Sequence, residues 1–232
     1  MHLYLVRHGQ SEGNLARPDA PHDPPLTPVG HAQAARVAAA LTSLPIAAVY
    51  ASPVTRALQT AAPIGRALDL PVRVWPCLSE TARGDWNAPE NPVPPFRKSG
   101  LFLREVREQF PGTEFSGDID DDAPWWESLA GERRAGAYAR AARALAMLAA
   151  AHPAGFGKTG LPGIEESLIA ITHGAFGSVL ISAALNTPPT DYNRYSQYNC
   201  GISLIYYTES EIRLRYLNSV EHLSLELRTD LT

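Results

Sequence analysis

The chain has 232 residues, of which 45% are hydrophobic and 19% are charged, and its formal net charge is −4. This length and composition are ordinary for a globular protein with a sizeable core. The basic residues form no concentrated block, so we expect no nucleic-acid partner. No apolar stretch is long enough to span a bilayer, so we expect no membrane association either.

The two cysteines, Cys77 and Cys200, lie within or beside apolar segments. Such placement is more typical of core residues than of a disulfide or a metal-binding pair. The N-terminus lacks the basic and apolar regions of a secretory signal. We therefore expect a cytoplasmic protein, and the sequence leaves open whether two copies associate into a homodimer.

Strand and helix patterns alternate along the chain. Strands are predicted at 2–6, 46–52, 72–75 and 167–174, and helices at 27–44, 53–68 and 175–185. Thr27 suits an N-cap and Pro28 the first helical position. This alternation predicts one α/β domain over residues 1–232, a three-layer α/β/α sandwich with a mostly parallel mixed sheet. The last two strands, 201–207 and 212–218, are joined by only "TESE", so they should be antiparallel neighbours.

Residues 85–126 depart from this alternation. Six prolines and seven aromatic residues occur there, and only one short helix, around 98–109, is predicted. A long helix is predicted to follow at 127–151. We interpret 85–126 as an irregular, lid-like cap insertion whose aromatic side chains shape a substrate pocket, with an ordinary small core as the alternative.

Polar residues follow each of the four predicted parallel strands. Ligands of open α/β sheets bind outside the carboxyl ends of such strands. The residues at those ends are Arg7, His8, Ser52, Arg56, Glu80 and His173. Arginines, histidines and helix N-termini at one edge predict a pocket for a doubly charged anion, and phosphate fits best. Gly9 and Gly174, which follow the two histidines, would let the backbone approach such a ligand closely.

The stretches "LVRHGQSEGN", "PLTPVGHAQA", "YASPVTRALQTA", "LSE" and "ITHG" resemble, in order, the signatures of the histidine phosphatase superfamily. This superfamily is also called phosphoglycerate mutase-like. The matches extend from residue 3 to residue 174. "RHG" alone is a weak signal, but the ordered set makes coincidence improbable.

The resemblance implies a role for each matched residue. His8 would attack phosphorus and become a transient phosphohistidine, and Asn14 would add a hydrogen bond to the phosphate. Arg7, Arg56 and His173 would hold the phosphoryl oxygens, and His173 would be more useful protonated. Glu80 would protonate the leaving oxygen and then take a proton from water. The arginines would offset the phosphate charge, so neither a metal nor another cofactor is expected.

The resemblance also favours one branch of the family. The chain has "ETARGDWN" where cofactor-dependent mutases carry an "ERHYG"-type stretch, and "PHDPPLT" where they carry "GWYD"-like residues. We therefore predict a broad-specificity phosphomonoesterase acting on a small phosphorylated metabolite. Two alternatives stand: a phosphoglycerate mutase or sugar-bisphosphatase, and a non-catalytic phospho-ligand or protein-binding member. All five catalytic positions are filled, which disfavours the last.

Overall fold

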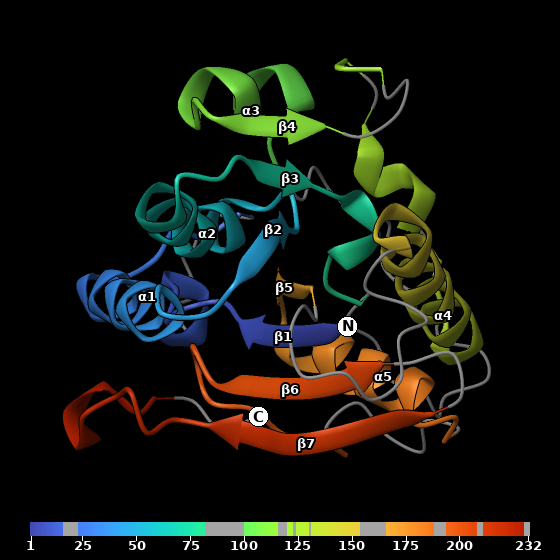
Figure 1. Cartoon of the computed structure of the whole chain (residues 1–232). Helices are drawn as coiled ribbons and strands as arrows, with labels where there is room; N and C mark the ends of the chain where they lie inside the picture. Colours follow the sequence, from blue (N-terminus) through green and yellow to red (C-terminus); the bar gives the residue numbers. More distant parts are fainter. Residues whose placement is uncertain are drawn as a thin grey trace.

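The computed structural model describes residues 1–15, 23–81, 100–115, 120–122, 124–129, 131–153, 166–187, 194–207 and 211–229. In this part of the chain, seven strands form one sheet in the order β4-β3-β2-β5-β1-β6-β7 (Figure 1). The strands are β1 (His2–Arg7), β2 (Ile46–Ala51), β3 (Val72–Val74), β4 (Thr113–Phe115), β5 (Ser167–Thr172), β6 (Ile202–Tyr207) and β7 (Ile212–Ser219).

The sheet is mixed, with a parallel part and an antiparallel edge. The four pairs formed among β1 to β5, which are β4-β3, β3-β2, β2-β5 and β5-β1, are all parallel. Strand β6 pairs antiparallel with β1 and with β7. The predicted antiparallel pairing of the last two strands is therefore confirmed, and so is the mostly parallel mixed sheet.

Helices cover both faces of the sheet. The helices are α1 (Pro28–Leu41), α2 (Thr55–Leu68), α3 (Leu103–Gln109), α4 (Arg134–Ala151) and α5 (Gly174–Ala184). Figure 1 shows α1 and α2 on one side and α4 and α5 on the other. Alternate residues of β1 enter different cores: Tyr4 and Val6 pack with α1 and α2, and Leu3 and Leu5 pack with α4 and α5. The predicted three-layer sandwich is confirmed.

Helix α1 begins as the sequence predicts, because the Thr27 hydroxyl accepts a hydrogen bond from the Gly30 N–H at 3.1 Å. Helix α4 begins later than predicted. Residues Trp125–Leu129 form a 3₁₀ turn instead, and Gly131 follows with a φ of +72°, a left-handed conformation that ends the turn. The predicted helix over 127–151 therefore starts at Arg134.

The 85–126 segment contains a strand that the sequence analysis missed. Strand β4 pairs in parallel with β3 and so extends the main sheet. Trp125 and Trp126 are buried in the same core as α1 and α2. These described aromatics thus pack as core residues. Within this insertion, residues 85–99, 116–119 and 123 lie outside the described residues, and a lid role for the insertion remains a prediction.

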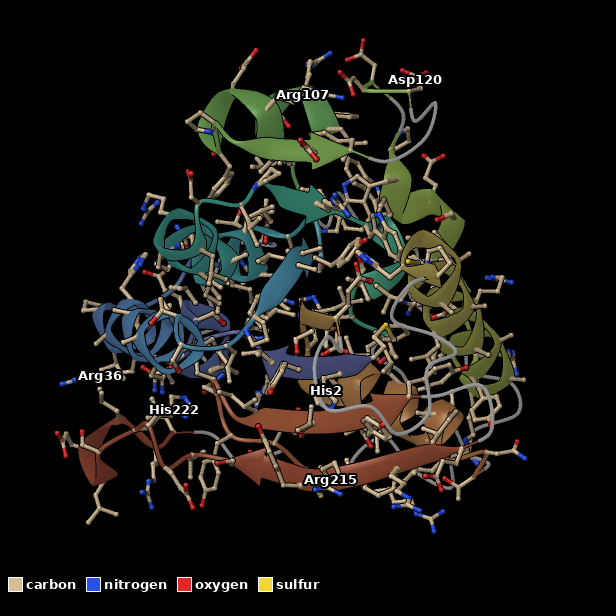
Figure 2. All side chains as sticks on the ribbon, viewed as in Figure 1. His2, Arg36, Arg107, Asp120, Arg215 and His222 are labelled. Carbon is tan, nitrogen blue, oxygen red and sulfur yellow. The ribbon has the colours of Figure 1, made fainter. Side chains whose placement is uncertain are left out.

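Charged side chains project from several edges of the fold. Figure 2 shows Arg36, Arg107 and Arg215 at three different places on its periphery. Among the described residues, no helix combines the length and the apolar character needed to cross a membrane.

Candidate active site

His8 lies immediately after β1, at the carboxyl edge of the parallel strands. Its backbone N–H continues the sheet by donating to the Thr172 carbonyl at 2.9 Å. Its ring nitrogen Nδ1 lies 2.7 Å from the Gly9 carbonyl oxygen. A carbonyl only accepts hydrogen bonds, so Nδ1 carries the proton and donates it. Nε2 therefore holds the lone pair, which is the state a nucleophilic imidazole needs.

Arg56, in the first turn of α2, links His8 and His173. Its Nε lies 3.2 Å from His8 Nε2, and its Nη2 lies 3.2 Å from His173 Nδ1. The two imidazole centroids are 5.1 Å apart. A guanidinium has no acceptor, so both facing histidine nitrogens accept. With one unprotonated nitrogen in each ring, both imidazoles are neutral.

Asp23 places Arg56, and the sequence analysis did not identify it. Both carboxylate oxygens accept from the Thr55 N–H, at 3.1 and 3.0 Å, and one accepts from the Thr55 hydroxyl at 2.7 Å. Asp23 thus caps α2 from a distant segment, and it lies 3.8 Å from Arg56 Nη1. Burial raises the pKa of Asp23 against the opposing effects of Thr55 and Arg56. No local pattern reveals this cap, because 32 positions separate the two residues.

His173 is fully buried, and its protonation differs from the expectation. Its Nε2 donates to the Ser52 hydroxyl at 2.9 Å, since Nδ1 already accepts from Arg56. Burial, followed by the charges of Arg56 and His8, holds the pKa of His173 well below its usual value of 6.5. The structure disfavours the protonated His173 that the resemblance favours, because burial and four cationic or ionisable neighbours oppose a further positive charge.

This pKa gives a prediction for stability. As the pH falls below about 6.5, unfolded His173 takes a proton that the folded site excludes, so the free energy of unfolding should decrease. His152 and His222, whose pKa values burial also lowers, act in the same direction. Urea unfolding at pH 7.5 and 5.5 should show a smaller decrease for His173→Gln than for wild type. Equal decreases would contradict the placement of a neutral His173.

The segment 197–200 forms hydrogen bonds with Arg7 and His8. Arg7, 3% exposed, donates from Nη1 to the Gln197 carbonyl at 2.6 Å. The Asn199 side chain donates to the His8 carbonyl at 3.1 Å. Cys200 is buried nearby, and its N–H donates to the Arg7 carbonyl at 3.0 Å. Gln197 and Asn199 were not singled out from the sequence, although they precede the predicted "GISLIYY" strand.

Glu80 reaches the same edge through the start of α5. Its Oε1 accepts from the backbone N–H groups of Thr81 and Phe176, each at 2.9 Å. Phe176 lies in the first turn of α5, three residues after His173, so the carboxylate stands at the N-terminus of the helix that His173 begins. This placement is stabilising for a carboxylate, because a helix N-terminus offers unpaired N–H groups and a positive dipole end.

The remaining residues predicted to bind substrate have structural contacts of their own. Asn14 Oδ1 accepts from the Ser11 N–H and hydroxyl, each at 2.9 Å, and so closes the turn after β1. Gly174 is the first residue of α5. Gly9 also has a packing role: a Cβ there would lie 2.7 Å from the Gly30 carbonyl oxygen of α1. It permits close packing of backbone on backbone.

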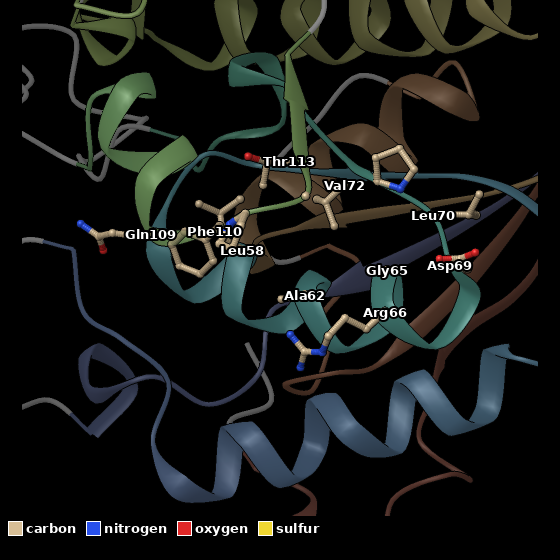
Figure 3. A pocket seen from close by; sticks show the side chains of 13 residues that line it. Leu58, Ala62, Gly65, Arg66, Asp69, Leu70, Val72, Gln109, Phe110 and Thr113 are labelled. Atoms are coloured by element: carbon tan, nitrogen blue, oxygen red, sulfur yellow. The ribbon is translucent and has the colours of Figure 1, made fainter.

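A separate pocket of about 480 Å³ lies between the end of α2 and the α3–β4 turn (Figure 3). Val72 and Thr113, the first residues of β3 and β4, line it. It therefore lies at the amino-terminal edge of the sheet, opposite the edge that carries His8. None of the predicted site residues lines this pocket.

Comparison with known proteins shows which family the sequence matches. A family model for the histidine phosphatase superfamily (branch 1) matches residues 3–220. A glucosyl-3-phosphoglycerate phosphatase of Mycobacterium tuberculosis is 28% identical over 191 residues, covering 82% of this chain and 78% of that protein. A protein of Yersinia enterocolitica named "Probable phosphoglycerate mutase GpmB" is 29% identical over 211 residues, covering 90% and 86%.

The fold also matches a solved structure. An Entamoeba histolytica phosphoserine phosphatase mutant in complex with phosphoserine has a TM-score of 0.65 and 24% sequence identity. The similarity covers 96% of this chain and 99% of that one. At this identity the match concerns the fold alone.

Proposed function

The chain belongs to the histidine phosphatase superfamily, and we propose that it hydrolyses small phosphate monoesters through a phosphohistidine on His8. One observation carries this proposal. His8 presents an unprotonated Nε2 to the guanidinium of Arg56, which also bonds His173. A neutral nucleophile is thereby held beside a fixed positive charge, as phosphoryl transfer requires.

In the proposed first step, His8 Nε2 attacks phosphorus in line with the leaving oxygen. The N–P bond forms while the P–O bond to the leaving group breaks, and Glu80 gives its proton to that oxygen. Arg56 and Arg7 stabilise the charge on the phosphoryl oxygens, because guanidinium groups bond such oxygens in pairs. The Nδ1–H bond to the Gly9 carbonyl stabilises the positive charge that develops on the imidazole.

The second step regenerates the enzyme. The Glu80 carboxylate takes a proton from water, the water oxygen forms a bond to phosphorus, and the N–P bond to His8 breaks. Inorganic phosphate leaves and Glu80 is protonated again. Two displacements replace one difficult attack by water, which is the usual benefit of covalent catalysis.

The first turn of α5 completes the proposed phosphate site. The N–H groups of Gly174 and Ala175 begin this helix, where no intrahelical acceptor is within reach. A dianion is stabilised at such a terminus by the N–H donors and by the helix dipole. We propose that the side-chain N–H group of Asn14 donates to the same phosphate. The Oδ1 atom of Asn14 accepts from Ser11, which orients the amide.

The proposal is tested with a panel of phosphate esters assayed in the presence of a metal chelator. The panel includes p-nitrophenyl phosphate, phosphoserine, 3-phosphoglycerate and simple sugar phosphates. We expect release of inorganic phosphate that the chelator does not reduce and that orthovanadate inhibits. No release from any ester, or activity lost with the chelator and restored by a metal ion, would contradict the proposal.

A mutase is the second candidate, favoured by the similarity to the Yersinia protein over 90% of this chain. It would use the same His8, Arg56 and Glu80 but deliver the phosphoryl group to a hydroxyl of phosphoglycerate instead of water. Incubation with 3-phosphoglycerate separates the two. The phosphatase releases inorganic phosphate, whereas the mutase forms 2-phosphoglycerate faster than it releases phosphate.

A further inference from the structure

Arg140 of α4 is a buried arginine whose bonds converge on the segment that ends at Glu80. It is 3% exposed. Its Nε and Nη2 bind the Glu132 carboxylate in a fork, at 2.8 and 2.6 Å. Nη1 donates to the carbonyls of Cys77 and Ser79 at 2.9 and 2.7 Å, and Nη2 makes a longer bond of 3.5 Å to the Glu80 carbonyl. These contacts use all five N–H groups of a guanidinium.

The segment that Arg140 holds has little regular structure of its own. It follows β3 as the short 3₁₀ turn Pro76–Leu78 and leads directly to Glu80. The remaining carbonyl in the run, that of Leu78, accepts from the Thr172 hydroxyl at 2.7 Å. All four consecutive carbonyls of 77–80 are therefore bound by side chains of α4 or β5. The position of Glu80 depends on these bonds rather than on a strand ladder.

Arg140 also contacts the group that binds the Glu80 carboxylate. Its Cζ lies 3.9 Å from the centre of the Phe176 ring, over the ring face. The backbone N–H of Phe176 donates to Glu80 Oε1 at 2.9 Å. The guanidinium thus touches the backbone of Glu80 on one side and the residue that holds its side chain on the other. Arg140 therefore binds the Glu80 backbone directly and packs against the residue whose N–H binds the Glu80 carboxylate.

Glu132 supplies the counter-charge that stabilises the buried guanidinium of Arg140. The side chains of Arg140 and Glu132 are only 4% and 9% exposed. A buried guanidinium without a counter-charge is strongly destabilising, whereas a forked pair with every donor satisfied is tolerated. Glu132 therefore fixes the plane of the guanidinium that donates to the carbonyls of Cys77, Ser79 and Glu80.

We propose that Arg140, held by Glu132, is a positioning residue that sets the geometry of proton transfer from Glu80 to the leaving oxygen. This inference rests on the proposed function, in which Glu80 is the acid. Both bonds that hold the carboxylate fall on Oε1. Oε2 then carries the proton, and a shift of the 77–80 backbone moves it relative to the substrate. Misplacement by about 1 Å can cost about 10²-fold in rate.

The leaving group of the substrate provides a specific test. An alkyl phosphate releases a strongly basic alkoxide and needs the proton from Glu80, while p-nitrophenyl phosphate releases a stable phenolate without it. The measured quantity is the ratio of kcat/KM for a simple alkyl phosphate to kcat/KM for p-nitrophenyl phosphate, because kcat/KM reports the phosphorylation step and excludes the later hydrolysis of the phosphohistidine, which is common to both substrates. We expect Arg140→Lys to lower this ratio at least about tenfold, out of the about 10²–10⁴-fold that general acid catalysis contributes. Lysine keeps the charge but cannot form the fork and the carbonyl bonds together.

Two further variants keep the test decisive. Glu132→Gln preserves shape and volume while loosening the fork, so it should lower the ratio in the same direction even where Arg140→Lys folds poorly. Arg143→Met alters an exposed arginine on the same helix and should leave the ratio unchanged. A merely structural defect would slow both substrates equally. An unchanged ratio in folded Arg140→Lys and Glu132→Gln would overturn the proposal.

Glu80→Gln distinguishes failure of this inference from failure of the proposed function. If Glu80 is the acid, this variant loses the alkyl phosphate reaction far more than the p-nitrophenyl phosphate reaction. If Glu80→Gln lowers kcat/KM for both substrates equally, the assignment of the acid is wrong. If Glu80→Gln lowers the ratio and the Arg140 and Glu132 variants do not, only the positioning role is wrong.

Discussion

His8→Ala is expected to lower kcat for every phosphate monoester by about 10⁴-fold or more, because it removes the atom that forms the bond to phosphorus. The substitution leaves Arg56 and Arg7 in place, so the site should still bind inorganic phosphate. The measurement is steady-state phosphate release combined with phosphate binding by calorimetry. A loss of turnover with retained binding is the expected pair of results.

The control for His8→Ala is His31→Ala. His31 lies exposed on α1, so its removal should leave kcat unchanged. Activity of His8→Ala within about tenfold of wild type would contradict a covalent route through His8. It would also leave the Nε2 contact with Arg56 without a catalytic explanation.

Arg56→Ala should reduce kcat/KM by about 10³–10⁵-fold, the range that a transition-state arginine contributes in other phosphoryl transfer enzymes. Two effects combine. The phosphoryl oxygens lose a forked positive donor, and both His8 and His173 lose the group that orients them at 3.2 Å. Arg56→Lys should recover little of the loss, because a compact ammonium lacks the planar fork with which the guanidinium contacts both imidazoles from separate nitrogens.

The matched control for Arg56 is Arg66 on the same helix. Arg66 is exposed in the last turn of α2, so Arg66→Ala tests for a general effect of removing an arginine from this element. It should leave kcat/KM within about twofold of wild type. A similar loss in both variants would indicate a defect in α2 rather than a role for Arg56 in the site.

The fold could be predicted where local patterns agree with the final packing. Thr27 and Pro28 mark the start of α1, and the apolar runs of β1, β2 and β5 mark strands that are buried on both faces. Strand β4 could not be predicted. It has only three residues, and its status as a strand depends on pairing with β3, which lies about 40 positions earlier in the chain.

The candidate site divides in the same way. His8, Arg56, Glu80 and His173 follow from the rule that polar residues at the carboxyl ends of parallel strands share one edge. Asp23, Asn199 and Arg140 do not, because each acts through contacts with residues distant in sequence. The neutral state of His173 also required the structure, since it depends on complete burial beside Arg56.

Trapping the covalent intermediate tests the central claim most directly. The enzyme is mixed rapidly with a radiolabelled phosphate ester, quenched in alkali to preserve a phosphohistidine, and digested for mass spectrometry. The account predicts label on His8, removed by a chase of unlabelled substrate at a rate at least equal to kcat, and no label in His8→Ala. An active enzyme that carries label on another residue, or that never becomes labelled, would contradict the account.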